Sequence, residues 1–208
     1  MNIKNIIFDF GGVFINLDFN AIVRSFKAAG FEHFEEHYAK AKQDSLFDDF
    51  EVGKITPEQF RDRIRQFSKT PMSDETIDKA WNSLLLDFPN DRKEWLFALK
   101  NKYRLFLLSN TNEIHIRCFE KILERDHGKN FLPDVFEKIY YSNRLGMRKP
   151  HAEIFDHVLK DNGLSLHDTI FIDDTERHVK GAKEFGMQAY LLDLSKQDIR
   201  ELGNDIGL

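Results

Sequence analysis

Five short segments of the chain are continuously apolar and rich in β-branched or aromatic residues, the pattern of strands buried on both faces of a sheet. They lie at 5–10, 104–108, 138–142, 169–173 and 188–192. Stretches with apolar residues at helical spacing occur between them, at 92–102, 150–160 and 176–185. Because strands that alternate with helices form parallel sheets covered on both faces, the pattern predicts an α/β fold with a Rossmann-like three-layer core.

The interval after the first strand breaks this alternation. It is about seventy residues long and contains three amphipathic helical patterns, at 20–29, at 57–67 and from residue 73 onward. Residues 56–59, Thr-Pro-Glu-Gln, form a capping box with proline at the first helical position. We therefore predict a small α-helical cap at 16–87, inserted after the first strand into a core of 1–15 and 88–208. A lid above the strand ends would be built this way.

Composition narrows the class of protein without identifying it. Hydrophobic residues make up 41% and charged residues 31% of the 208 positions, as in ordinary globular proteins. The net charge is −5 and the basic residues are scattered, so we expect no nucleic-acid partner. Cys118 is the only cysteine, on an amphipathic helical pattern, and we expect it to be structural. With no leader-like or membrane-length apolar stretch, we expect a cytoplasmic protein without a membrane partner. No feature indicates the oligomeric state.

Polar side chains follow four of the predicted strands at the point where each strand ends. The four groups are Asp9, Ser109 with Asn110, Lys149, and Asp173 with Asp174. In a doubly wound sheet the carboxyl ends of the strands lie along one edge, where ligands bind. Each group alone is common in turns and helix caps. Found in this order at four strand ends, they predict one functional site.

These residue types form a coherent chemical set. Carboxylates gathered in one crevice repel one another unless a hard cation neutralises them, and oxygen ligands of this kind suit Mg²⁺. The hydroxyl and amide groups at Ser109 and Asn110, together with the Lys149 ammonium, would bind the oxygens of a phosphoryl group. Asp9 is then left as an in-line nucleophile, which would form an aspartyl-phosphate that water cleaves.

With these motifs the chain resembles the haloacid dehalogenase-like (HAD) hydrolase superfamily across essentially its full length. The segments that carry the resemblance are IIFDFGGV at 6–13, LSNTN at 108–112, GMRKP at 146–150 and FIDD at 171–174. The helical insertion is similar to that family's cap. Within the superfamily the chain looks most like bacterial phosphatases acting on α-D-glucose 1-phosphate. More distantly, it is similar to the N-terminal phosphatase domain of soluble epoxide hydrolase. The resemblance implies a Mg²⁺-dependent phosphomonoesterase for a small phosphorylated metabolite, such as a sugar phosphate.

The resemblance also implies roles for individual residues. Three groups would bind Mg²⁺: the carboxylate of Asp9, which is also the nucleophile, the backbone carbonyl of Gly11, and the carboxylate of Asp174. Asp173 would lie beside them or act through water. Three side chains would hold the phosphoryl group, namely Ser109, Asn110 and Lys149. Lys149 would in addition balance the charge of the nucleophile and the phosphate.

Gly11 departs from the usual pattern of the superfamily. Most of its phosphatases carry a second aspartate two residues after the nucleophile, which protonates the leaving group and later activates water. A glycine cannot do this, a loss of roughly 10²–10⁴ in rate for a poor leaving group. The glucose 1-phosphate branch looks to share this glycine. Either the substrate has a good leaving group, as in a sugar 1-phosphate, acyl phosphate or aryl phosphate, or another group supplies the proton. Asp18 and His115 are the candidates for that group.

Three other functions are alternatives to this one. A 2-haloacid dehalogenase would use Asp9 without metal, and the Asp173-Asp174 pair argues against it. A receiver-type signalling domain would store the acyl phosphate, but a large cap after the first strand does not fit it. A non-catalytic phosphometabolite sensor would bind phosphate esters without turnover, which the loss at Gly11 permits.

The sequence does not identify the natural substrate, because cap side chains of unknown orientation should set specificity. Asp48, Asp49 and Phe50 are possible cap contacts. An acidic, aromatic helix end is the simpler interpretation of this segment.

Overall fold

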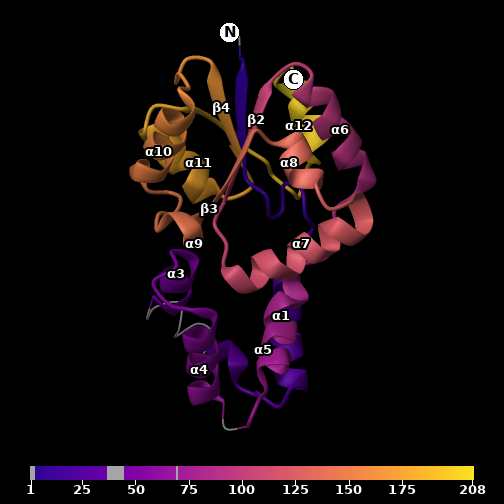
Figure 1. Cartoon of the computed structure of the whole chain (residues 1–208), viewed down its shortest axis with the longest axis vertical. Helices are drawn as coiled ribbons and strands as arrows, with labels where there is room; N and C mark the ends of the chain where they lie inside the picture. Colours follow the sequence, from indigo (N-terminus) through magenta and orange to yellow (C-terminus); the bar gives the residue numbers. More distant parts are fainter. Residues whose placement is uncertain (1–2, 37–44, 69) are drawn as a thin grey trace.

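A five-stranded parallel sheet forms the centre of the larger part of the molecule (Figure 1). The computed structural model of the chain describes residues 3–36, 45–68 and 70–208. The strands are β1 (Asn5–Phe8), β2 (Arg104–Ser109), β3 (Lys138–Tyr141), β4 (Thr169–Asp173) and β5 (Gln188–Leu191), in the spatial order β3-β2-β1-β4-β5. Strand β1 is central and pairs in parallel with β2 and β4. The predicted parallel sheet is confirmed, and all five strands lie where the apolar runs placed them.

Helices cover both faces of the sheet, which confirms the three-layer core. On one face lie α6 (Asn90–Lys100), α7 (Glu113–His127), α8 (Phe131–Val135) and the C-terminal α12 (Ile199–Asp205). On the other lie α10 (Ala152–Asn162) and α11 (Glu176–Glu184), while the short α9 (Ser142–Leu145) follows β3 directly. Successive side chains of a strand point to opposite faces. Accordingly, Ile6 and Phe8 are buried in one hydrophobic cluster and Ile7 in the other.

A second group of helices extends from the carboxyl end of β1 and forms the lower part of Figure 1. It consists of α1 (Phe19–Ala28), α3 (Leu46–Glu51), α4 (Pro57–Phe67), α5 (Asp74–Trp81) and the 3₁₀ helix η1 (Asn82–Leu84). These helices enclose a hydrophobic cluster of their own, with Phe26, Phe60 and Ile77 fully buried. Helix α4 begins at the predicted capping box, where Thr56 and Gln59 exchange side chain to backbone hydrogen bonds. The division into a core of 1–15 and 88–208 and a cap of 16–87 stays our prediction.

The cap contacts the core on both sides of the cavity. Where the chain enters and leaves the cap, the two connecting segments run side by side: Asn16 N–H donates to Asp87 O at 2.9 Å, and Asp18 N–H to Leu84 O at 2.9 Å. On the opposite side of the cap, α3 lies against α9 of the core (Figure 1). The helical insertion is therefore held over the carboxyl edge of the sheet from both sides.

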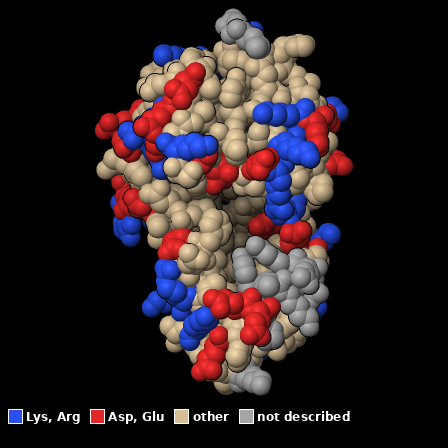
Figure 2. Space-filling view, turned by 180° about the vertical axis from the view of Figure 1, so that it is seen from behind, with Lys and Arg blue, Asp and Glu red and all other residues tan. Residues whose placement is uncertain are grey.

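On the face shown in Figure 2, acidic and basic side chains are interspersed. The same face is hollowed between the core and the cap (Figure 2). Among the described helices, none has both the length and the apolarity needed to cross a lipid bilayer.

Candidate active site

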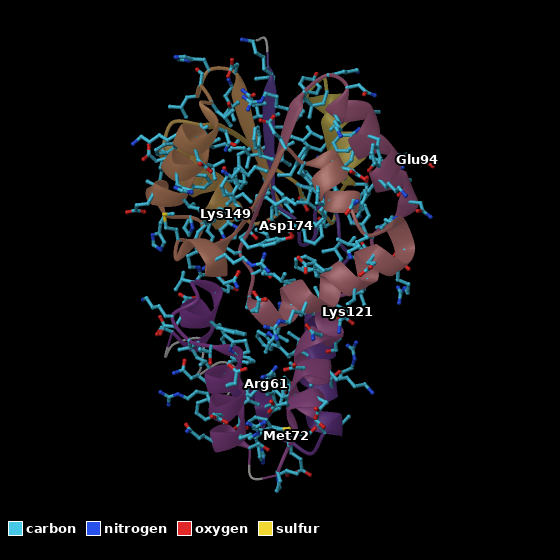
Figure 3. The ribbon with its side chains drawn as sticks, in the orientation of Figure 1. Arg61, Met72, Glu94, Lys121, Lys149 and Asp174 are labelled. Atoms are coloured by element: carbon cyan, nitrogen blue, oxygen red, sulfur yellow. The ribbon has the colours of Figure 1, made fainter. Side chains whose placement is uncertain are left out.

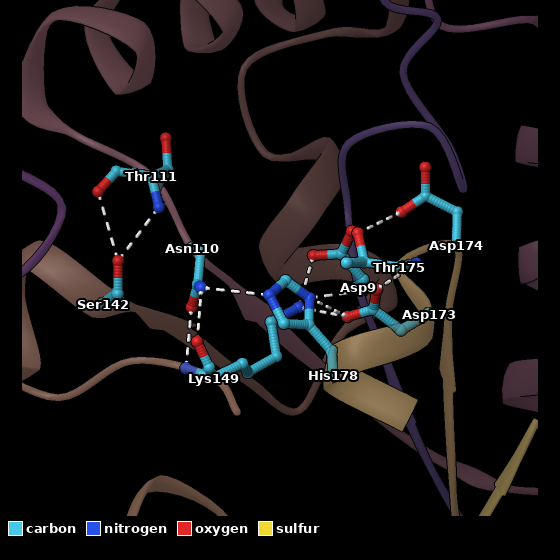
Figure 4. A network of polar contacts seen from close by, with 9 residues as sticks. All are labelled: Asp9, Asn110, Thr111, Ser142, Lys149, Asp173, Asp174, Thr175 and His178. Carbon is cyan, nitrogen blue, oxygen red and sulfur yellow. Dashed lines mark hydrogen bonds and ion pairs between the residues drawn. The ribbon is translucent and has the colours of Figure 1, made fainter. Parts of the chain in front are cut away.

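Polar residues from several strands converge at the edge of the core that faces the cap. Asp9 directly follows β1, Ser109 ends β2 and Asp173 ends β4, while Lys149 comes from the loop between α9 and α10. Lys149 and Asp174 are seen at this edge in Figure 3, and the network that joins them is enlarged in Figure 4. The structure therefore brings together the side chains that the strand-end pattern grouped into one site.

Lys149 is the centre of this network. Its side chain is fully buried, and its Nζ lies 2.6 Å from Asp9 Oδ1 and 2.6 Å from Asp173 Oδ2. Although burial alone would lower the pKa of Lys149, the Asp173 and Asp9 carboxylates raise it above its ordinary value. The ammonium is therefore a permanent cation between two carboxylates.

The two carboxylates bound to Lys149 differ in their electrostatics. Burial raises the pKa of Asp9, and repulsion from Asp173 and Asp174 adds to this rise, while Lys149 opposes it. For Asp173, burial is outweighed by Lys149 and by His178, and its pKa is lowered. Asp9 is thus the carboxylate that would gain most from an additional cation.

Asp9, Asp173 and Asp174 together fit a divalent metal ion. Each offers a carboxylate oxygen, and these atoms all lie within 4.8 Å of one another. Asp173 is already engaged on both oxygens, by Lys149 and His178 and by the Thr175 amide at 2.7 Å. The contact recorded for Asp174 is a 3.3 Å hydrogen bond from the Thr175 hydroxyl. Burial and the neighbouring Asp173 raise the pKa of Asp174 to about 6. The charge that a cation would neutralise therefore lies mainly on Asp9 and Asp174.

The glycine turn after Asp9 closes tightly on this cluster. Gly12 has φ +75°, and a Cβ atom at this position would lie 2.2 Å from Asp174 Oδ2. Only glycine allows both the left-handed backbone and this close approach. Gly11 lines the same cavity as Asp9 and Asp174, but the structure does not test its predicted role as a metal ligand.

Asn110 is committed to the loop that carries Lys149. Its Oδ1 accepts the Lys149 N–H at 3.0 Å, and its Nδ2 donates to the Lys149 carbonyl at 3.0 Å. The Asn110 side chain thus holds the Lys149 backbone in place, and with it the point from which the buried Lys149 side chain extends. Ser109, 4% exposed, lines the cavity beside it. Both residues line the cavity where a phosphoryl group could be held. The Asn110 side chain amide in addition binds the Lys149 backbone.

A cavity of about 310 Å³ separates these residues from the cap, a volume typical of sites for small ligands. Its floor is formed by core residues, including Asp9, Gly11, Ser109, Asn110, Asp174, Thr175, Arg177 and His178. Its roof is formed by cap residues, namely Leu17, Phe19, Ile22, Glu51, Trp81, Leu84 and Leu85. The charged groups of the floor and a mainly apolar roof would enclose the two ends of a phosphorylated metabolite.

Both candidate proton donors already have hydrogen-bond partners in the structure. Asp18 caps the N-terminus of α1 and accepts a hydrogen bond from Arg24 at 2.5 Å, which lowers its pKa. His115 lines the cavity, but its Nδ1 lies 3.0 Å from Asn112 Nδ2 and its Nε2 3.2 Å from the Trp81 carbonyl. Burial lowers the pKa of His115 to about 4. The imidazole is therefore neutral, and its Nε2 donates to the Trp81 carbonyl of the cap, while its Nδ1 faces Asn112 of the core.

Two residues of the site were missed by the sequence analysis. His178 is 7% exposed, and its Nδ1 lies 3.1 Å from Asp173 Oδ2, so it helps to orient the carboxylate that holds Lys149. The sequence signal that could have identified His178 is its position four residues after Asp174, at the start of the predicted helix. Glu51 ends α3 and lines the cavity. Among the described residues the lining includes none of the three cap contacts considered from the sequence, Asp48, Asp49 and Phe50.

Comparisons with known proteins agree on one family. A family model described as haloacid dehalogenase-like hydrolase matches residues 3–186. A D-ribitol-5-phosphate phosphatase from Bacteroides thetaiotaomicron is 30% identical over 188 residues, covering 90% of this chain and 91% of the relative. The solved structure of HAD family enzyme BT-2542 from Bacteroides thetaiotaomicron, in complex with magnesium and inorganic phosphate, is 40% identical with a TM-score of 0.86. It covers 96% of this chain and 98% of that one. A HAD-like family hydrolase from Porphyromonas gingivalis has a TM-score of 0.86 at 29% identity, with 100% of both chains covered.

Proposed function

We propose that this chain, which belongs to the haloacid dehalogenase-like hydrolase family, is a Mg²⁺-dependent phosphomonoesterase acting on a small phosphorylated sugar or polyol. The family predicted from the four motifs is confirmed. The observation that carries the proposal is the buried Lys149 ammonium between Asp9 and Asp173, with Asp174 beside them. A relative that acts on D-ribitol 5-phosphate and a solved relative holding magnesium and phosphate support it.

Asp9 and Asp174, with the carbonyl of Gly11, are the proposed Mg²⁺ ligands. The donor set fits the ion because it is made of oxygens and because the three clustered carboxylates carry more negative charge than Lys149 neutralises. When bound, Mg²⁺ would offset the charge of the phosphoryl oxygens and polarise the phosphorus centre. Asp173 would lie beside the ion without binding it directly, because its oxygens already bind Lys149, His178 and Thr175.

In the proposed reaction, an Asp9 carboxylate oxygen forms a bond to phosphorus as the bond from phosphorus to the leaving alcohol oxygen breaks. The alcohol departs after gaining a proton, and water then cleaves the aspartyl-phosphate, which releases inorganic phosphate and restores Asp9. Lys149 favours the ionised nucleophile and would stabilise the transferring group, with Ser109 and Asn110 beside it. Closure of the cap over the cavity would keep bulk water away from the acyl phosphate.

Two classes of leaving group are compatible with this site. D-ribitol 5-phosphate is an ester of a primary alcohol, a poor leaving group, and residue 11 offers no side chain to protonate it. Asp18 is bound to Arg24 and His115 to the Trp81 carbonyl, so either would have to exchange its partner to protonate the leaving group. A substrate with a good leaving group, such as a sugar 1-phosphate, acyl phosphate or aryl phosphate, stays the other hypothesis. The cytoplasmic location also stays a prediction.

The test is phosphate release from D-ribitol 5-phosphate, glucose 1-phosphate, glucose 6-phosphate and p-nitrophenyl phosphate, with Mg²⁺ or with chelator. Wild type should release phosphate only with Mg²⁺, and Asp9→Asn should release none. Turnover of 2-haloacids without metal would identify a dehalogenase instead. Binding of phosphate esters with no turnover in the wild type would identify a sensor.

A further inference from the structure

Glu51 is the one charged residue that the described part of the cap contributes to the lining of the catalytic cavity. Its neighbours in the roof are apolar or aromatic: Leu17, Phe19, Ile22, Trp81, Leu84 and Leu85. A carboxylate in such surroundings destabilises the fold unless it is paired. Glu51 therefore needs a charged partner, and the core supplies it.

The core holds Glu51 in place, although the residue belongs to the cap. Arg148, only 8% exposed, lies with its Nη2 2.9 Å from Glu51 Oε2, and its other terminal nitrogen pairs with Asp48. The Ser142 hydroxyl donates to the Glu51 carbonyl at 2.5 Å and accepts the Thr111 N–H at 2.9 Å. Both the side chain and the backbone of Glu51 are thus tied to loops at the ends of β2 and β3.

The chain just after Glu51 also approaches the core closely. Gly53 has φ +69°, and a Cβ atom there would lie 2.2 Å from the backbone oxygen of Asn143 in α9. A side chain at residue 53 would push α3 away from α9. The contact between cap and core at this point is therefore tight and specific, which fixes the carboxylate relative to Asp9 and Lys149.

The Glu51 side chain lines the cavity and keeps 29% of its surface exposed, although its Oε2 is buried beside Arg148. Burial raises the pKa of Glu51, and the Arg148 guanidinium opposes this rise. In its ionised form the carboxylate accepts hydrogen bonds and donates none. It would therefore bind hydroxyl groups, while the apolar roof contacts the carbon chain that carries them.

We infer that Glu51 accepts a hydrogen bond from a hydroxyl group of the leaving alcohol, and so makes the enzyme selective for polyhydroxylated phosphate esters over plain alkyl phosphates. This inference rests on the proposed phosphomonoesterase function. Glu51 is a specificity-determining residue in this scheme, and the chemistry at phosphorus does not depend on it. A hydrogen bond to a charged group contributes about tenfold to a hundredfold in affinity.

The test compares two esters of similar length, D-ribitol 5-phosphate and n-pentyl phosphate, by the ratio of their kcat/KM values. In Glu51→Gln the ratio should fall about tenfold to a hundredfold, with the change mainly in KM for the ribitol ester. Asp48→Asn is the matched control, because Asp48 also pairs with Arg148 but does not line the cavity. Its ratio should stay within about threefold of wild type.

Equal losses for both esters in Glu51→Gln would overturn the inference, as would a shift of the ratio in Asp48→Asn as large as that in Glu51→Gln. A wild-type enzyme that prefers n-pentyl phosphate would overturn it as well. Hydrolysis of p-nitrophenyl phosphate separates these failures from failure of the proposed function. If that ester is cleaved with dependence on Mg²⁺ and Asp9, the phosphatase stands and only the role of Glu51 is lost. If no ester is cleaved by the wild type, both fall.

Discussion

Replacement of Lys149 by methionine would remove the cation from the carboxylate cluster and keep most of the side-chain volume. Lys149 is fully buried, with Nζ 2.6 Å from both Asp9 and Asp173. After the change these carboxylates would stay buried without their countercharge. Removing one partner of a buried ion pair costs about 3–5 kcal/mol. We therefore expect the free energy of unfolding of Lys149→Met to be lower than that of the wild type by about this amount.

Urea unfolding at pH 7 with chelator present would measure this difference without a contribution from bound Mg²⁺. The same substitution in an Asp9→Asn background should cost less by about 0.5–3 kcal/mol, since residues of one ion-pair network couple by this amount. Lys160→Met is the matched control. Lys160 pairs with Asp156 at 2.8 Å but is 77% exposed, and its loss should change stability by less than about 1 kcal/mol.

Two results would refute this reasoning. A loss in Lys149→Met no larger than that in the Lys160 control would mean that the buried ammonium does not compensate the carboxylates. Equal losses in the wild-type and Asp9→Asn backgrounds would mean that Lys149 and Asp9 do not interact energetically. In either case the electrostatic basis for activating Asp9 would be wrong, whatever the effect of the substitutions on phosphate release.

Three further predictions concern metal binding, pH and the glycine turn. Mg²⁺ at a hundred times its Kd should stabilise the wild type against thermal unfolding by about 2.7 kcal/mol. The same stabilisation by Mg²⁺ in Asp174→Asn would contradict the role of Asp174 as a ligand. His115 has a pKa of about 4, below its ordinary 6.5, so the unfolded chain binds the proton more tightly. Stability should therefore be complete above pH 6.5 and fall by up to about 3 kcal/mol toward pH 4. Urea unfolding should show a flatter pH profile for His115→Gln, and parallel profiles would count against this. Gly12→Ala should lower both stability and Mg²⁺ affinity, because its Cβ would lie 2.2 Å from Asp174 Oδ2; unchanged calorimetric titration with Mg²⁺ would contradict it.

The parts of the fold that follow from local signals were predictable from the sequence. The apolar runs located all five strands. A strand buried on both faces is apolar at nearly every position, and this pattern differs clearly from that of a polar loop. Helix α4 has its predicted bounds, Pro57–Phe67, because the Thr56 capping box marks its beginning. The strand-end site was predictable for a topological reason, since the carboxyl ends of parallel strands always share one edge.

What escaped prediction depends on contacts between distant segments. Helix α3 is only six residues long, too short to show a period, so nothing marked Glu51 as a cavity residue. His178 becomes informative only when the first turn of α11 is known to point it at Asp173. Asp18 shows that a candidate catalytic carboxylate can also have a local structural reason. It precedes a helix and caps it, which is the commonest reason for an aspartate at that place.

Arg148 and Lys149, adjacent in the chain, link the cap to the catalytic cluster. Lys149 binds the core carboxylates of Asp9 and Asp173, while Arg148 binds the cap carboxylates of Asp48 and Glu51. The Asn110 side chain clamps the backbone between these two functions. A rotation that lifted α3 from the core would break the Arg148 pairs and leave this guanidinium, now 8% exposed, without its partners. Water would then solvate the separated charges, so the pairs themselves contribute only modestly to holding α3 against the core. The segment of Arg148 and Lys149 thus connects cap helix α3 with the charged cluster around Asp9.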